Sequence, residues 1–170
     1  ATTFALRSFL ELLSSLRFND IYTVDLHSNM AFEYLDNLTN VYPVEAIKNA
    51  IDKFNPDIVV FPDKGACSRY SHRFSLPHIS IHKERDQLTG HLTIKGIVNE
   101  NNINLDNKKM LIVDDLCDGG GTFILAADAL YNEGAKEVAL YTTHGIYSKG
   151  TQVLKDNLIT RIFNLNGEIE

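Results

Sequence analysis

Helical spacing of apolar residues recurs along the chain and divides it into segments. Apolar side chains at positions 6, 9, 10, 13 and 16 form one stripe, and those at 44, 47, 51 and 54 form another behind Pro43. Proline is favoured in the first turn of a helix because its missing N–H would have no partner there. These patterns predict helices over residues 4–16, from residue 43 onward, over 67–73 and 123–133, and a last helix capped by Ser148.

Short apolar runs between these segments predict strands over residues 21–26, 57–61, 76–82, 110–113, 137–142 and 161–163. The runs at 57–61 and 110–113 are nearly continuous, which indicates central strands covered on both faces. Residues 85–96 contain Gly90 and predict a long loop or hairpin. Strands that alternate with helices imply an α/β fold with a mainly parallel sheet flanked by helices. Ligands bind beyond the carboxyl ends of such strands, so the residues after 21–26, 57–61 and 110–113 are the candidates for chemistry.

Composition narrows the class of protein. The 170 residues are 44% hydrophobic and 22% charged, which suits one globular domain or slightly more. No apolar run reaches the roughly 20 residues of a membrane helix, and no basic signal-peptide segment opens the chain. The two cysteines, Cys67 and Cys117, fit neither a disulfide framework nor a zinc site, so we expect a cytoplasmic protein. A net charge of −6 argues against a nucleic-acid partner.

Charge is unevenly distributed along the chain. Six of the 16 basic residues lie between Lys64 and Lys95, together with only two acids, Glu84 and Asp86. Three aspartates then fall within residues 114–118. A basic stretch and an acidic loop are suitable parts of a site for an anion and a metal ion. Two solvated surface segments are the alternative, and charge alone favours that alternative.

The strongest signal for chemistry is the segment 110–123, MLIVDDLCDGGGTF. A buried strand runs into carboxylates and glycines in the order Asp114, Asp115, Asp118, Gly119, Gly120, Gly121 and Thr122. Glycines allow backbone N–H groups to approach an anion, and the following helix N-terminus favours a phosphate. Carboxylates beside a phosphate are explained if they bind sugar hydroxyls or the waters of Mg²⁺. The segment matches neither a Walker A loop nor a dinucleotide loop, and a flexible glycine-rich turn is the alternative.

This segment resembles the phosphoribosyl-diphosphate motif shared by type I phosphoribosyltransferases and ribose-phosphate diphosphokinases. Four further segments resemble the diphosphokinase (phosphoribosyl diphosphate synthetase) family in order and separation: TVDLHS at 23–28, FPDKGACSR at 61–69, HKER at 82–85 and GAKEVALYTTHGIYSKG at 134–150. The resemblance covers most of the chain. It implies a type I phosphoribosyltransferase-like fold, a mainly parallel sheet flanked by helices.

The resemblance also implies a reaction, in which diphosphate passes from ATP to the 1-hydroxyl of ribose 5-phosphate to give phosphoribosyl diphosphate and AMP. Residues 118–122 are then expected to cradle the 5-phosphate, and Asp114 and Asp115 to bind the ribose hydroxyls. The expected diphosphate loop consists of Asp63, Lys64, Gly65 and Ala66. The implied assembly is a homodimer or hexamer.

Metal binding and catalysis are implied in the same way. Asp25, His27 and Asp63 are expected near Mg²⁺ and the ATP phosphates, and His27, Lys83 and Arg85 are the implied catalytic residues. Lysine and arginine suit the negative charge that develops on the transferred phosphate oxygens. Taken alone, however, Asp25 and His27 fit a buried polar pair at a strand end, and residues 83–86 fit an exposed run of alternating charge.

The chain departs from the family at two loops and in length. Gly119 stands where the family usually has threonine, and Lys64 and Ala66 interrupt the usual glycine pair of the diphosphate loop. The family is about twice as long. We therefore expect residues 1–40 to be the tail end of an amino-terminal half, residues 41–170 to be the carboxy-terminal domain, and the chain to be a fragment.

Alternative functions remain open at this point. The chain could be a type I phosphoribosyltransferase that uses phosphoribosyl diphosphate. It could be a diphosphokinase that acts on a larger ribose-phosphate ester such as ADP-ribose, because the loss of a hydroxyl at residue 119 relaxes the phosphate loop. It could also be a non-catalytic regulatory paralogue that retains the binding pocket.

Overall fold

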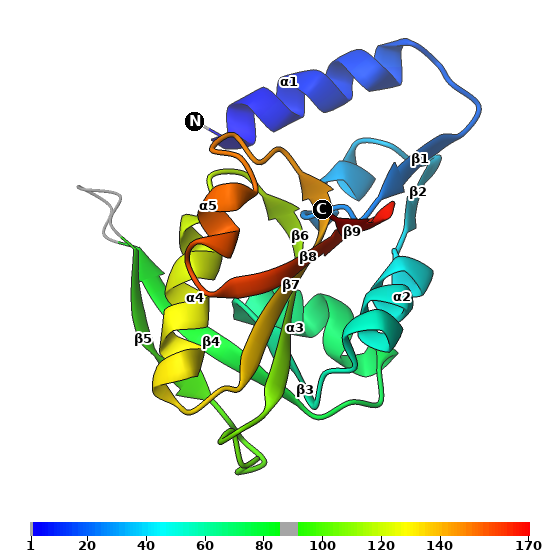
Figure 1. Ribbon diagram of the computed structural model, residues 1–170. Coiled ribbons are helices and arrows are strands. Elements are labelled where there is room, and N and C mark those ends of the chain that lie inside the picture. Colours follow the sequence, from blue (N-terminus) through cyan, green and yellow to red (C-terminus); the bar gives the residue numbers. More distant parts are fainter. Residues whose placement is uncertain (1, 86–91) are drawn as a thin grey trace. The chain divides into compact units, whose positions relative to one another are not determined.

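The computed structural model describes residues 2–85 and 92–170 (Figure 1). It divides the chain into two compact units, Ala1–Pro43 and Val44–Glu170, close to the predicted boundary between residues 40 and 41. Within the described ranges, no helix has the length and apolar character needed to cross a membrane. The interpretation of the first unit as the end of a longer amino-terminal half stays a prediction.

The first unit is a helix and a small parallel sheet. It contains α1 (Thr2–Ser15), β1 (Ile21–Val24), the 3₁₀ helix η1 (Asn29–Glu33) and β2 (Leu38–Val41). Strands β1 and β2 pair in parallel, with Ile21 opposite Leu38. Leu10, Ala31 and Leu35 form the buried core with Leu38. The predicted helix and first strand are confirmed, whereas β2 was not predicted because its sequence, LTNV, carries two polar residues among four.

The second unit is built on a seven-stranded sheet. Its helices are α2 (Val44–Phe54), α3 (Lys64–Tyr70), η2 (Ser71–Arg73), α4 (Gly121–Asn132) and α5 (Gln152–Lys155). Its strands are β3 (Ile58–Phe61), β4 (His78–Arg85), β5 (Leu92–Val98), β6 (Lys109–Cys117), β7 (Glu137–Gly145), β8 (Ile159–Asn164) and β9 (Gly167–Ile169). Figure 1 shows α4 and α5 against one face of this sheet and α2 and α3 against the other. The predicted α/β architecture is confirmed.

The sheet order is β5-β4-β3-β6-β7-β8-β9. The five inner strands are parallel, and the edge strands β5 and β9 are antiparallel to their neighbours. The chain leaves β3 toward β4 on one side and later returns to β6 on the other side. The carboxyl ends of β3 and β6 therefore adjoin at the point where the strand order reverses, which is the usual ligand position in such sheets.

Several boundaries differ from the sequence-based expectation. Strand β6 continues past residue 113 to Cys117, because β7 pairs with it through Asp114 opposite Thr142 and Leu116 opposite His144. Of the segment 85–96, expected as a loop or hairpin, residues 92–96 belong to β5, which pairs in antiparallel fashion with β4, and residues 86–91 lie outside the described residues. The expectation that Ser148 caps the last helix is wrong: Thr151 occupies the cap position of α5. Strand β9 was not predicted.

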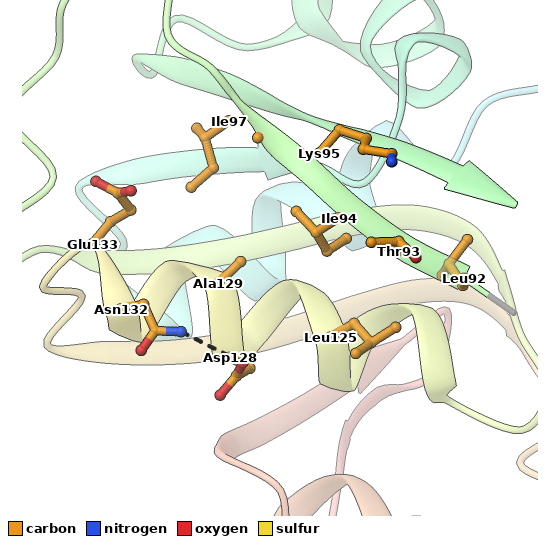
Figure 2. Close-up of a pocket in the computed structure, with 11 residues that line it drawn as sticks. Leu92, Thr93, Ile94, Lys95, Ile97, Leu125, Asp128, Ala129, Asn132 and Glu133 are labelled. Carbon is orange, nitrogen blue, oxygen red and sulfur yellow. Dashed lines mark hydrogen bonds between the residues drawn. The ribbon is translucent and has the colours of Figure 1, made fainter.

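A groove of about 440 Å³ lies between the edge strand β5 and helix α4. Figure 2 shows Ile94 of β5 and Leu125 of α4 on its apolar walls, and Asp128 hydrogen-bonded to Asn132 at its rim. None of the residues that line it belongs to the predicted site.

Gly120 is the turning point between β6 and α4, and it supports a stability prediction. Its φ is +77°, and a Cβ there would lie 2.6 Å from Cδ2 of Leu154. We expect Gly120→Ala to lower the free energy of unfolding by about 1–3 kcal/mol, through backbone strain and overpacking. Gly121→Ala is the matched control, because its Cβ would meet nothing within 4 Å. Urea unfolding at 25 °C measures both, and equal losses in the two variants would contradict this account.

Candidate functional site

Asp63 ends the loop after β3 and begins α3. Its Oδ1 accepts a hydrogen bond of 2.9 Å from the backbone N–H of Ala66, so it is the N-cap of the helix. This cap explains why α3 begins at Lys64, earlier than the predicted residue 67. Of the expected diphosphate loop, Lys64 and Gly65 are exposed and Ala66 is buried.

Lys83 of β4 reaches across to the same carboxylate. Its Nζ lies 2.8 Å from Oδ2 of Asp63, and the two side chains are 24% and 35% exposed. Burial acts to raise the pKa of Asp63, but the Lys83 ammonium, the Ala66 N–H and the nearby Arg69 together lower that pKa below its usual value. Asp63 is therefore ionised at neutral pH, and Lys83 is not a member of a fully solvated charge run.

Asp114 and Asp115 lie at the carboxyl end of β6 and are almost fully buried, at 8% and 5% exposure. Arg69 of α3 holds both: its Nη2 lies 3.2 Å from Oδ1 of Asp114 and 3.1 Å from Oδ1 of Asp115. The Nε of Arg69 is also buried and has no hydrogen-bond partner among the described residues. One guanidinium thus compensates two carboxylates, which leaves the site with excess negative charge.

The excess negative charge favours the binding of a proton by the carboxylate pair. Burial, followed by the neighbouring carboxylate of Asp115, raises the pKa of Asp114 to about 8. The same carboxyl also accepts the backbone N–H of Asp115, at 2.9 Å, which favours its ionised form but does not outweigh burial. In the absence of a ligand, the pair therefore holds a proton near neutral pH.

The glycine segment follows directly. Asp118 is exposed, Gly119 is half-buried, and Gly120 caps α4 in the left-handed conformation. Helix α4 starts at Gly121, and Thr122 is half-buried in its first turn. The amino end of a 12-residue helix therefore opens onto this loop, which is a suitable arrangement for an anion.

The second unit thus brings together two loops and a strand at one edge of the sheet. Asp63 is linked to Lys83, and Asp114 and Asp115 are linked to α3 through Arg69. Arg69 was not among the predicted site residues, although it lies inside the segment 61–69, which resembles a segment of the diphosphokinase family. The backbone of Arg85 ends β4, and its side chain lies outside the described part of the structure.

Asp25 and His27 belong to the first unit, where they follow β1. Asp25 is buried, has a φ of +57°, and donates its backbone N–H to the carbonyl of Val41 at 2.9 Å. His27 is exposed, so the two residues are not a buried polar pair. Their expected role at a metal ion stays a prediction.

Carboxylate side chains are the candidate ligands for Mg²⁺. In the described ranges, no three His, Cys, Asp or Glu side chains are grouped to hold a metal ion. Mg²⁺ commonly takes only one or two carboxylates, together with waters and substrate phosphates. Asp63 fits that arrangement, because among the described residues its Oδ2 is bound by the partly exposed Lys83 alone.

Comparisons with known proteins identify the family of the second unit. The family described as "Phosphoribosyl transferase domain" matches residues 44–170, which is the second unit. The ribose-phosphate pyrophosphokinase of Pyrococcus abyssi is 32% identical over 151 residues, which are 86% of this chain and 51% of the relative. The chain spans about half the length of the curated relatives it matches.

Solved structures give the same fold. The phosphoribosylpyrophosphate synthetase of Mycobacterium smegmatis is similar with a TM-score of 0.74 and 25% identity, over 94% of this chain and 53% of that one. The APRTase of Giardia lamblia shares the fold with a TM-score of 0.58 at 13% identity, over 81% of this chain and 80% of that one. The expected type I fold and the resemblance of the sequence are thereby confirmed.

The raised pKa of Asp114 predicts how stability depends on pH. The folded chain binds a proton that the unfolded chain releases near its ordinary pKa of about 4, so the free energy of unfolding falls as pH rises from about 4 to about 8. The slope is at most about 1.4 kcal/mol per pH unit for one proton. We expect Asp114→Asn to flatten this slope. Urea unfolding between about pH 5 and about pH 9 without divalent cations tests it, and parallel curves for both proteins would contradict the assignment.

Proposed function

Since this chain belongs to the phosphoribosyl transferase domain family, we propose that it binds ribose 5-phosphate and takes part in the transfer of diphosphate from Mg-ATP to the 1-hydroxyl of that sugar. The products are 5-phosphoribosyl 1-diphosphate and AMP. One observation carries the proposal: the Asp63–Lys83 pair and the carboxylates held by Arg69 adjoin at the edge where the β3–β6 strand order reverses. The relatives named ribose-phosphate pyrophosphokinase supply the reaction type.

The acceptor sugar is bound by β6 and its loop in this proposal. Asp114 and Asp115 accept hydrogen bonds from the ribose hydroxyls, and residues 118–122 hold the 5-phosphate through backbone N–H groups at the start of α4. The shared proton of the two buried carboxylates leaves when the hydroxyls donate to them. Ribose 5-phosphate therefore binds more tightly as pH rises toward about 8.

The transferred diphosphate is bound by α3 and β4. Charge develops on the non-bridging oxygens during displacement at the β-phosphorus, so positioned cations lower the barrier. Lys83 is suited to this because its ammonium and the Asp63 carboxylate that it binds are both partly exposed, so the ammonium can exchange Asp63 for a phosphate oxygen. Arg85 follows two residues later on β4, and its guanidinium offers a fork of donors to phosphate.

Mg²⁺, when bound, neutralises and orients the phosphate oxygens. Asp63 is the ligand that we propose in the second unit, and a role for Asp25 and His27 near a metal ion is a separate proposal for the first unit. Asp63 retains its contact with the Ala66 N–H through Oδ1, so the loop stays capped when Oδ2 changes partner. A homo-oligomer is proposed for the whole protein by analogy with its relatives.

A type I phosphoribosyltransferase is the second candidate. The second unit alone matches the phosphoribosyl transferase domain over residues 44–170 and contains both loops. Such an enzyme would consume phosphoribosyl diphosphate with a base and would not require ATP.

The full-length protein incubated with Mg²⁺, ATP and ribose 5-phosphate is expected to release AMP. Lys83→Ala should lower kcat by about 100-fold or more, because a transition-state cation is lost. Lys95→Ala is the matched control: Lys95 lies on the partner strand β5 and, within the described part of the chain, pairs with the exposed Glu84 alone. Its activity should stay within about twofold, since exposed ion pairs contribute little.

Each other outcome has a defined meaning. No AMP above the Lys83→Ala/Arg85→Ala double variant would overturn the proposed reaction in favour of a non-catalytic paralogue. AMP that appears only with ADP-ribose would retain the reaction and change the acceptor. Nucleotide formation from phosphoribosyl diphosphate and a base, without ATP, would establish the second candidate.

A further inference from the structure

The turn that follows β7 is fixed against the end of β6. The backbone N–H groups of Ile146 and Tyr147 donate to the carbonyl of Cys117, at 2.8 and 3.3 Å. The N–H of Gly150 donates to the carbonyl of Tyr147 at 2.7 Å and closes the turn. Residues 146–150 are therefore attached at the residue that immediately precedes the loop 118–122.

The side chain of Tyr147 fixes the turn in a second way. Its ring packs directly over Gly145, so closely that a Cβ on this glycine would overlap the ring. Its hydroxyl lies 3.0 Å from Oγ1 of the buried Thr142. The position of the turn over the ends of β6 and β7 is thus set by packing and hydrogen bonding from both strands.

This arrangement brings Lys149 onto the loop. A Cβ on Gly119 would lie 3.6 Å from Cε of Lys149, and 3.9 Å from Oγ of Ser148. Lys149 forms no ion pair or hydrogen bond with any residue that the structure describes, although the exposed Asp118 carboxylate is adjacent to Gly119 in the chain. An exposed cation that forms no ion pair with the described residues therefore has its stem against Gly119.

We propose that Lys149 is a further phosphate-binding residue, which donates from its ammonium to the phosphate monoester held by residues 118–122. The inference rests on the proposed function, because it takes the ligand to be a sugar phosphate. Gly119 has no side chain to offer a donor, and the stem of Lys149 covers its open side. The ammonium also offsets the repulsion between Asp118 and the phosphate.

The proposal specifies the ligand class. A terminal phosphate monoester carries close to two negative charges at neutral pH, whereas a phosphodiester carries one. A loop that contains Lys149 therefore favours the monoester of ribose 5-phosphate over a ribose joined through a diester or diphosphate bridge. Lys149 therefore disfavours a larger acceptor such as ADP-ribose, which the missing side chain at Gly119 would otherwise allow.

Calorimetric titration of the full-length protein with ribose 5-phosphate, without ATP, tests the assignment. Lys149→Gln should weaken binding about tenfold, the loss expected for one charge-assisted hydrogen bond, and Lys149→Arg should retain most of the affinity. Lys136→Gln is the matched control, because Lys136 is also exposed but precedes the amino end of β7. It should bind within about twofold of wild type.

A rescue variant makes the test specific to the loop. A Cβ at position 119 would make only ordinary van der Waals contacts and the residue has no positive φ, so Gly119→Thr in the Lys149→Gln background is chosen to supply a hydroxyl donor to the same phosphate. We expect it to recover part of the lost affinity, and Gly119→Ala in that background to recover none. The ratio of affinities for ribose 5-phosphate and its methyl phosphodiester should also fall in Lys149→Gln.

Wild-type affinity in Lys149→Gln would overturn this inference and leave the proposed function intact. Absence of ribose 5-phosphate binding by wild type would overturn both. Binding that follows these expectations in a protein that releases no AMP would support the phosphate site and remove only the proposed reaction.

Discussion

The site depends on one guanidinium that holds two buried carboxylates. Arg69 stands within 3.2 Å of both Asp114 and Asp115, and each of the three side chains is at most 13% exposed. Burying such charges is costly unless they are paired, and loss of one partner leaves the others uncompensated. The contact therefore fixes α3 against the end of β6, and with it the position of Asp63 at the start of the same helix.

Local sequence was sufficient to predict an element wherever the structure of that element depends on its own residues. The continuous apolar runs at 57–61 and 110–113 predicted the two central strands, and the glycines after Asp118 predicted the turn into α4. Arg69 was missed as a site residue because its partners lie 45 positions away on β6. Ser148 was assigned to a helix cap from its residue type alone, but the hydrogen bond that closes at Gly150 keeps it in the turn before Thr151. Such errors arise where contacts between distant segments decide the structure.

The strand order explains why these distant segments meet. Val60 of β3 lies opposite Ile112 of β6, so the residues that follow each strand leave the sheet side by side. The extension of β6 to Cys117 then carries the chain beyond this edge before it turns at Gly120. Residues 63–66 and 118–122, the loops that we propose for diphosphate and phosphate, are consequently separated along the edge by the buried aspartates, which matches the order of groups in a sugar that carries phosphates at both ends.

Although the net charge is −6, the cations Arg69 and Lys83 have different roles at the site. Arg69 is nearly enclosed and faces two carboxylates, so its release would expose buried negative charge. Lys83 is 24% exposed and faces one carboxylate that is itself 35% exposed, and pairs in such surroundings contribute only about 1 kcal/mol or less. A phosphate can therefore take Lys83 from Asp63 at small cost, whereas it cannot take Arg69 from β6. The fixed cation maintains the shape of the site, and the exchangeable one is available to the phosphate ligand that we propose.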